Sequence, residues 1–328
     1  MSGEVPAARF RNFITRQRDI ILQTHDYPDP DAIASAYGLS MLVAELGGTA
    51  VICHTGSITR AITQEMISVL QIPILPAVLA PGRENAILVV DGRIKNDNVT
   101  KFPGRYIGEI DHHPGEIAPD GDAYHDVRPH YGSTSSIVGE YWRDLALPIP
   151  QSVATALAIG LNTDTQRLLR GVTAEDIEIY AWLFRHADRE YLQYVLNSNI
   201  ERADFAWFSK AIANLEVRDR FGMTDLGEMD NPALLAIICD FLLTAREINV
   251  MLAVARTGGR VLLSMRSESS QHAADRIVQY VTTGIGSGGG HRSMAAGSCQ
   301  ISDGSPDDFI KRLIAERFFS AIQHSSYS

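Results

Sequence analysis

Two patterns of apolar positions alternate along the first 185 residues. Short, mostly apolar runs have the length of buried parallel strands, and they occur at 20–24, 49–54, 86–90 and 105–110. Between them, apolar residues recur three or four positions apart, as in amphipathic helices, at 8–16, 33–46, 60–70, 137–145 and 153–161. Strand and helix therefore alternate, which predicts an α/β fold with a doubly wound, mostly parallel sheet.

The pattern changes after residue 185. Two polar amphipathic helices, at 188–195 and 202–215, have no strand-like run between them and favour a helical connector. The elements expected after it are a helix opened by Asn231 and Pro232, a hairpin of 250–256 and 260–266, a helix at 273–280, a strand at 294–301 and a helix at 306–322. We therefore expect a catalytic domain at 1–186, a connector at 187–219 and a smaller C-terminal α/β domain at 220–328.

Metal-competent side chains follow three of the predicted N-terminal strands and one predicted helix. They are His25, Asp29 and Asp31 after the first strand, Asp91 after the third, Asp111, His112 and His113 after the fourth, and Asp164 after the helix at 153–161. In open α/β sheets, ligands bind at the carboxyl edge of the strands. Each signal has an ordinary alternative, because Asp31 can cap a helix, Asp91 can form a turn and Asp-His-His is common in polar loops. Their recurrence at successive element ends favours one shared site.

Four carboxylates and three imidazoles suit oxygen-preferring divalent ions, Mn²⁺ or Mg²⁺, better than structural zinc. Seven donors are too many for one ion that also holds substrate, but they suit a pair roughly 3.5 to 4 Å apart. Such a pair activates water and stabilises phosphoryl charge, so the reaction expected is phosphoester hydrolysis.

The composition limits which class of substrate and which cellular compartment can be expected. The chain of 328 residues has a formal net charge of -10, which argues against a protein that tracks long nucleic acid through phosphate neutralisation. The three cysteines, Cys53, Cys239 and Cys299, lie in apolar runs and are expected to be reduced core residues. Since neither a secretion signal nor a long apolar run is recognisable, a cytoplasmic protein without membrane contact is expected.

Other phosphate-binding motifs are absent or ambiguous in the sequence. No Gly-x-x-x-x-Gly-Lys-Ser/Thr loop occurs. The glycine-rich segment 286–290 follows a predicted helix late in the chain, which argues against a dinucleotide fold. Its backbone amides could cradle a phosphate, or it could be a flexible turn.

These motifs resemble the DHH phosphoesterases that carry a C-terminal DHH-associated domain, part of the RecJ-like superfamily. The resemblance rests on His25-x-x-Pro28-Asp29-x-Asp31-Ala32, Asp91, Asp111-His112-His113, Asn162-Thr163-Asp164-Thr165 and the segment Gly288-Gly289-Gly290-His291 with Ala295-Ala296-Gly297. It covers nearly the whole chain, and the two-domain size is most similar to the nanoRNase and pAp phosphatase branch.

The resemblance implies a role for each of these residues. It places His25 and Asp29 on one Mn²⁺ and Asp31, His112 and Asp164 on a second, with Asp91 bridging the two and Mg²⁺ or Co²⁺ as substitutes. His113 would face the scissile phosphate and Asp111 would orient it. A substrate clamp would come from Arg266, Ser267, Gly288, Gly289, Gly290 and His291, although Arg266 could also be an ordinary surface strand residue.

The function expected is therefore Mn²⁺-dependent hydrolysis of short oligoribonucleotides, dinucleotides or nucleoside 3',5'-bisphosphates such as pAp. The alternatives are an inorganic polyphosphate or pyrophosphate hydrolase, a single-strand-specific exonuclease and a non-enzymatic nucleotide sensor. The partner expected is a short nucleotide or a phosphorylated small molecule. Neither a long nucleic acid nor a membrane is expected, and a homodimer is left open.

Overall fold

The computed structural model describes residues 5–58, 60–76, 86–115, 123–197, 200–232, 234–300 and 307–321, without the side chains of residues 307 and 308. The chain divides into two compact units, Met1–Asn199 and Ile200–Ser328. Within the described ranges, no helix is both long and apolar enough to cross a bilayer.

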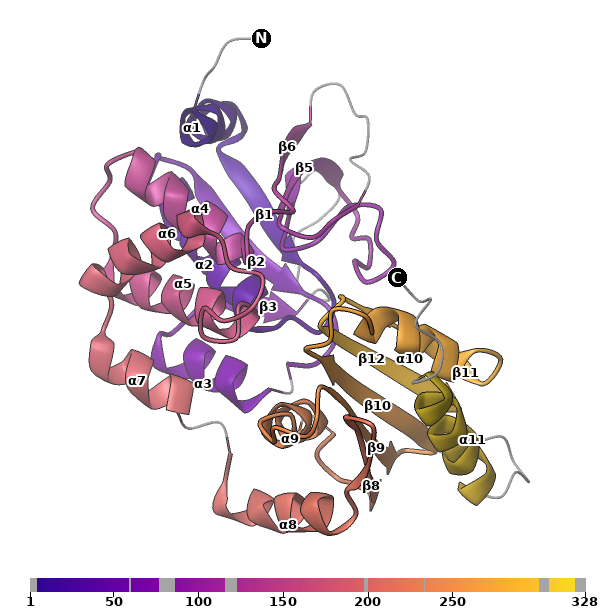
Figure 1. Ribbon diagram of the computed structural model, residues 1–328. Helices are drawn as coiled ribbons and strands as arrows, with labels where there is room; N and C mark the ends of the chain where they lie inside the picture. Colours follow the sequence, from indigo (N-terminus) through magenta and orange to yellow (C-terminus); the bar gives the residue numbers. More distant parts are fainter. Residues whose placement is uncertain are drawn as a thin grey trace. The chain divides into compact units, whose positions relative to one another are not determined.

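A parallel sheet forms the centre of the first unit (Figure 1). Its strands are β1 (Asp19–Thr24), β2 (Thr49–His54), β3 (Ile74–Pro76), β4 (Ala86–Val90), β5 (Arg105–Asp111) and β6 (Tyr124–Val127). Their order is β3-β2-β1-β4-β5-β6, and every pair is parallel. The predicted α/β class is thus confirmed. The strand order reverses between β1 and β4, which is where such sheets bind ligands.

The helices of the first unit pack on one face of this sheet. They are α1 (Pro6–Gln17), α2 (Pro30–Glu45), α3 (Ala61–Val69), α4 (Thr134–Asp144), α5 (Gln151–Asp164), α6 (Ala174–His186) and α7 (Arg189–Asn197). Because strand side chains alternate between faces, Ile20 and Leu22 join the helix-covered core, whereas Ile21 points to the opposite face. There Ile21 packs with Cys53 and with Phe102 from the segment between β4 and β5.

The second unit is built on a mixed sheet with the order β11-β12-β10-β9-β8-β7. Its strands are β7 (Glu216–Arg218), β8 (Phe221–Glu228), β9 (Val250–Thr257), β10 (Arg260–Ser267), β11 (Gly286–Gly290) and β12 (Met294–Gln300). The helical elements are η2 (Arg202–Asp204), α8 (Phe205–Ala213), α9 (Leu234–Leu242), α10 (Ala274–Thr282) and α11 (Asp307–Ser320). Helices α8 and α9 contribute to one core and α10 and α11 to another, so the sheet is covered on both faces.

The hairpin of β9 and β10 is confirmed, and its turn residues Gly258 and Gly259 both have positive φ, 54° and 74°. Strands β3, β6, β7 and β8 were not predicted, because they are short or mix polar with apolar residues. The segment predicted as a connector, 187–219, is divided between the units. Helix α7 belongs to the first unit, where Leu192 and Val195 join the core, and α8 belongs to the second. The three cysteines are buried and free.

Candidate active site

The element ends that carry the predicted ligands meet at the carboxyl edge of the first sheet. His25, Asp29 and Asp31 follow β1, Asp91 follows β4, Asp111, His112 and His113 lie at the end of β5, and Asp164 is the last residue of α5. Strand β4 pairs with both β1 and β5, so the three strand ends are neighbours. The structure therefore brings these side chains together at the switch point of the sheet.

Helix α2 begins one residue after Asp29, which is its N-cap. Asp29 Oδ1 accepts hydrogen bonds from two backbone N–H groups of the first turn, at 3.0 and 3.2 Å. Pro30 occupies the first helical position, where its missing N–H costs nothing. Asp31, which the sequence allowed as the cap, lies inside the first turn instead. Its carboxylate accepts the N–H groups of Thr134 and Ser135, at 2.8 and 2.9 Å, and so joins α2 to α4.

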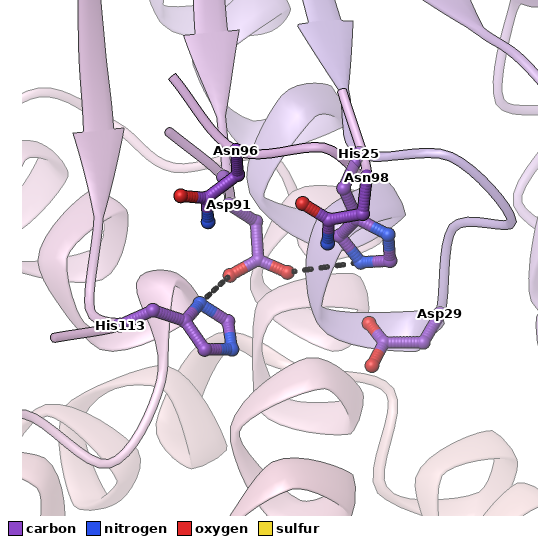
Figure 2. A pocket seen from close by; sticks show the side chains of 7 residues that line it. His25, Asp29, Asp91, Asn96, Asn98 and His113 are labelled. Carbon is purple, nitrogen blue, oxygen red and sulfur yellow. Dashed lines mark ion pairs between the residues drawn. The ribbon is translucent and has the colours of Figure 1, made fainter. Parts of the chain in front are cut away.

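Asp91 occupies the centre of the site in an unusual backbone conformation. Its φ is 56°, in the left-handed region that aspartate tolerates better than most residues but that still costs about 1 kcal/mol or more. Only 2% of Asp91 is exposed. Its carboxylate lies 3.6 Å from His25 Nε2 and 3.8 Å from both His112 Nε2 and His113 Nδ1. Figure 2 shows the contacts with His25 and His113. Asp91 thus links ligands from all three strand ends.

Hydrogen bonds to Nδ1 fix the tautomers of the three imidazoles. His25 Nδ1 and His112 Nδ1 lie 2.8 and 3.2 Å from backbone carbonyl oxygens, and His113 Nδ1 lies 2.8 Å from Asp111 Oδ1. Carbonyl oxygens and carboxylates accept, so each Nδ1 carries a hydrogen. The Nε2 atoms of His25 and His112 are therefore available as ligands, as in many metal sites.

The ionisable groups of the site compete for protons. Burial raises the pKa of the Asp31 and Asp91 carboxyls. Burial would lower the pKa of His112, but the neighbouring Asp164 carboxylate outweighs it and holds this pKa well above its usual value. Burial would also lower the pKa of His113, but the hydrogen bond with Asp111 outweighs this effect and raises the pKa to about 9. The raised pKa values of the two imidazoles reflect the carboxylates around them, and a cation bound there would neutralise this negative charge.

Several donors converge closely enough for a divalent cation to bind. Ligand atoms lie within 4.8 Å of one another in three groups, which are His25, Asp29 and Asp91; Asp31, His112 and Asp164; and Asp91, His112 and His113. His112 Nε2 is buried and lies 3.0 Å from Asp164 Oδ2, but the pair lacks hydrogen-bond geometry, and no other described group bonds this nitrogen. A buried nitrogen without a hydrogen bond and the carboxylate that it faces are a suitable pair of donors for a cation. The first two groups contain the residues that the resemblance assigns to two separate ions.

A cavity of ≈ 200 Å³ opens beside these ligands. Its lining consists of His25, Asp29, Asp91, Gly92, Asn96, Asn98 and His113 (Figure 2). Asn96 and Asn98 come from the segment between β4 and β5 and were not predicted, because no motif distinguishes them from ordinary loop asparagines. They bring neutral amide donors and acceptors next to the charged ligands.

Arg93 is a further residue that the sequence did not reveal. Its side chain is 1% exposed and donates from Nε to Glu109 Oε1, which is equally buried, at 3.2 Å. Its Nη1 and Nη2 donate to the carbonyl oxygens of His113 and Gly115, at 3.3 and 3.4 Å. Arg93 therefore ties the segment after Asp91 to the segment that carries the histidines.

In the second unit, the glycine-rich segment was predicted as a loop, and this was wrong. Gly286–Gly290 forms strand β11, paired with β12, so its amides on that side are already bonded. Strand β12 begins only four residues after β11 ends, so the two form a hairpin, but glycine-rich residues show no alternation of apolar and polar side chains that would reveal a strand. Close packing explains Gly288, because a Cβ there would lie 2.2 Å from Val278 Cγ1 of α10.

The other predicted clamp residues lie near the same end of that sheet. Arg266 pairs in register with Met294, where β12 begins, and His291 follows β11 directly. The Arg266 side chain is largely buried, and its Nε donates to Asp240 Oδ1 at 2.7 Å. Ser267 Oγ donates to a backbone carbonyl at 2.5 Å. Arg266 is thus not the surface strand residue that the sequence allowed, and its role toward substrate stays a prediction.

Comparison with known proteins places the N-terminal half of the chain in context. The model of the DHH family, N-terminal domain, matches residues 19–161. An uncharacterised protein of Methanocaldococcus jannaschii is 29% identical over 86% of this chain and 58% of its own length. The cyclic-di-AMP phosphodiesterase GdpP of Geobacillus thermodenitrificans is 24% identical over 94% of this chain and 49% of its own length. The chain thus spans about half to three fifths of these relatives.

Among solved structures, an exopolyphosphatase-related protein from Bacteroides fragilis has the same fold. It superposes with a TM-score of 0.76 at 16% identity and covers 98% of this chain and 97% of its own. At this identity, the likeness concerns the fold of the chain and not its substrate.

Proposed function

Residues 19–161 match the N-terminal domain of the DHH family, and on this premise we propose that the chain is a divalent-metal-dependent phosphoesterase that cleaves short nucleotides such as dinucleotides or nucleoside 3',5'-bisphosphates. The observation that carries the proposal is the position of Asp91. Its buried carboxylate stands between the imidazoles of His25 and His112, which belong to two different groups of donors. A shared carboxylate between two donor groups is the arrangement expected where two cations act on one phosphate.

The donor set favours Mn²⁺ or Mg²⁺. His25, Asp29 and Asp91 would hold one ion, and Asp31, His112 and Asp164 the other. Carboxylate oxygens with a minority of imidazole and no thiolate suit these ions. When bound, such ions lower the pKa of water and offset the charge of phosphoryl oxygens.

His113 has the protonation and position of a residue that acts on the substrate. It lines the cavity, and the Asp111 hydrogen bond holds its ring through Nδ1. In the metal-free chain, the hydrogen bond with Asp111 raises the pKa of His113 to about 9, so the imidazole carries a proton at neutral pH. We assign to His113 the proton that the leaving oxygen needs, or the binding of a phosphoryl oxygen. Arg93 supports this role from behind by holding the His113 carbonyl.

The cavity lining favours a nucleotide over inorganic polyphosphate. The residues that line the described cavity include two neutral asparagines and no lysine or arginine. A polyphosphate chain has about one charge for each phosphate and would need cations beyond the metal ions. Amides instead suit the hydroxyl groups of a sugar or the edge of a base. The name of the relative GdpP, a phosphodiesterase acting on a cyclic dinucleotide, supports the same class of substrate.

The test compares four substrates at equal concentration in MnCl₂: pApA, pAp, inorganic polyphosphate and a 20-nucleotide single strand. We expect pApA or pAp to be consumed at least tenfold faster than the other two, and EDTA to abolish turnover. Ion-exchange chromatography detects AMP, and a phosphomolybdate assay detects free phosphate. Preferential release of phosphate from polyphosphate, faster cleavage of the long strand, or undiminished turnover in EDTA would each overturn the proposal.

A further inference from the structure

Tyr27 is an exposed aromatic residue placed between two predicted metal ligands. It lies two residues after His25 and two before Asp29, so its Cα is within about 7 Å of each of theirs. Despite this position, 68% of the residue is exposed. The ring is therefore available to contact a ligand bound near His25 or Asp29.

The ring of Tyr27 is held in place by the loop after β2. The φ of Tyr27 is 56°, a left-handed conformation that bulky residues rarely adopt. A Cβ on Gly56 would lie 2.6 Å from Tyr27 Cδ1, so the ring rests directly against this glycine. Gly56 itself has a φ of 71°. Both the conformation and the close approach therefore require glycine at position 56.

The backbone around Tyr27 is clamped from two sides. Tyr27 N–H donates to the Thr55 carbonyl at 3.0 Å, and Asp26 N–H donates to the Asn98 carbonyl at 2.7 Å. The Asp26 carboxylate accepts two further hydrogen bonds from Thr100, at 3.1 and 2.7 Å. Asn98, the partner on one side, lines the cavity. The ring is thus preorganised, and ligand binding need not order it.

We propose that Tyr27 is a stacking platform for the nucleobase of the substrate, with the phosphate of the same nucleotide at the donor cluster beside it. The inference rests on the proposed function, and it specifies which residue would bind the nucleobase of the substrate. Stacking suits an aromatic ring with one face supported by protein and the remainder exposed, and it tolerates any base. The Cα atoms of His25 and Asp29 lie within about 7 Å of that of Tyr27, a separation that one nucleotide can span.

The experiment measures binding, so that it does not depend on turnover. Isothermal titration calorimetry of the Mn²⁺-loaded full-length protein gives Kd for AMP and for ribose 5-phosphate, which differ by the base. We expect the wild type to bind AMP about five- to a hundredfold more tightly. Tyr27→Phe should keep this ratio, whereas Tyr27→Leu, which still covers Gly56, and Tyr27→Ala should reduce it to about 1. Tyr194→Ala is the control, because Tyr194 is 54% exposed on α7.

An unchanged ratio in Tyr27→Leu, or a wild type that binds both ligands equally, would overturn the stacking role. Metal content and circular dichroism of each variant establish that the site and the fold are intact. If the base preference depends on Tyr27 but pApA and pAp are not hydrolysed, the stacking role stands and the proposed function fails.

Discussion

Replacing Asp91 by asparagine tests separately how this residue contributes to metal binding and to the stability of the fold. Asparagine has the same shape and also tolerates the left-handed conformation at φ 56°. Its side-chain oxygen can still accept the hydrogen bond that Thr134 Oγ1 donates at 2.7 Å. The change therefore removes one buried negative charge together with its ion-pair contacts to His25, His112 and His113. Because burial raises the pKa of Asp91, that charge is unfavourable in the metal-free protein.

We expect the variant to lose the stabilisation by Mn²⁺ and turnover, while the metal-free protein becomes as stable as the wild type or more so. At a Mn²⁺ concentration of about 100 times Kd, binding to one site stabilises the wild type by about 2.7 kcal/mol. For a unit the size of Met1–Asn199, each kcal/mol raises Tm by about 2 to 4 °C. The wild type should therefore gain about 5 to 10 °C.

The assay is thermal unfolding followed by circular dichroism, in EDTA and in MnCl₂, with metal content from elemental analysis. Asp97→Asn is the control, because Asp97 is exposed on the same segment and does not line the cavity. It should show the same metal-dependent shift as the wild type. If Asp91→Asn keeps that shift and binds two Mn²⁺ per chain, Asp91 is not a shared ligand and the argument for the site is refuted.

Three further predictions test the site and its surroundings. First, the metal-free protein should become less stable as pH rises from about 6.5 to 9. The reason is that the pKa of His113 is about 9 in the folded chain and returns to its ordinary value on unfolding. Urea denaturation at several pH values in EDTA measures this, and a free energy of unfolding that rises with pH would contradict it. Second, Arg93→Met should cost about 3 to 5 kcal/mol by removing the guanidinium that pairs with the buried Glu109 charge, and adding Glu109→Leu should restore part of it. Equal stability of the single variant and the wild type in urea would show that the pair is not needed. Third, Gly288→Ala should cost about 1 to 3 kcal/mol, because the new Cβ would lie 2.2 Å from a side-chain carbon of α10. Gly289→Ala should be nearly neutral, because no atom lies within 4 Å of the Cβ that it adds. Equal denaturation midpoints of the two variants would contradict the packing argument.

Local patterns were sufficient for the elements that create the metal site. The apolar runs of β1, β4 and β5 reveal these strands because strands buried on both faces leave few polar positions. A histidine or aspartate immediately after such a run lies at the carboxyl edge of a parallel sheet. His25, Asp91 and His112 could therefore be assigned to one edge without knowledge of their distances.

Contacts between distant residues required the tertiary structure. Arg93 pairs with Glu109 across two segments, and neither residue belongs to a recognisable motif. Arg266 meets Asp240, which lies on a helix 26 positions earlier in the chain. A buried ion pair depends on which segments pack together, and local periodicity contains no such information.

The structure of the glycine-rich segment also could not be predicted from the local sequence. Glycines at 286–290 are locally compatible with a loop, and the sequence determined only that side chains are missing there. Tertiary structure decided that this segment pairs with β12 as strand β11 and that α10 packs against Gly288. The sequence by itself thus determined the strands, their ligand-bearing ends and the chemistry of those ligands, because these depend on neighbours in the chain. The fold alone decided which donors lie close enough together to hold a cation, which charges are paired and which glycines are needed for packing, because these depend on residues that folding brings together.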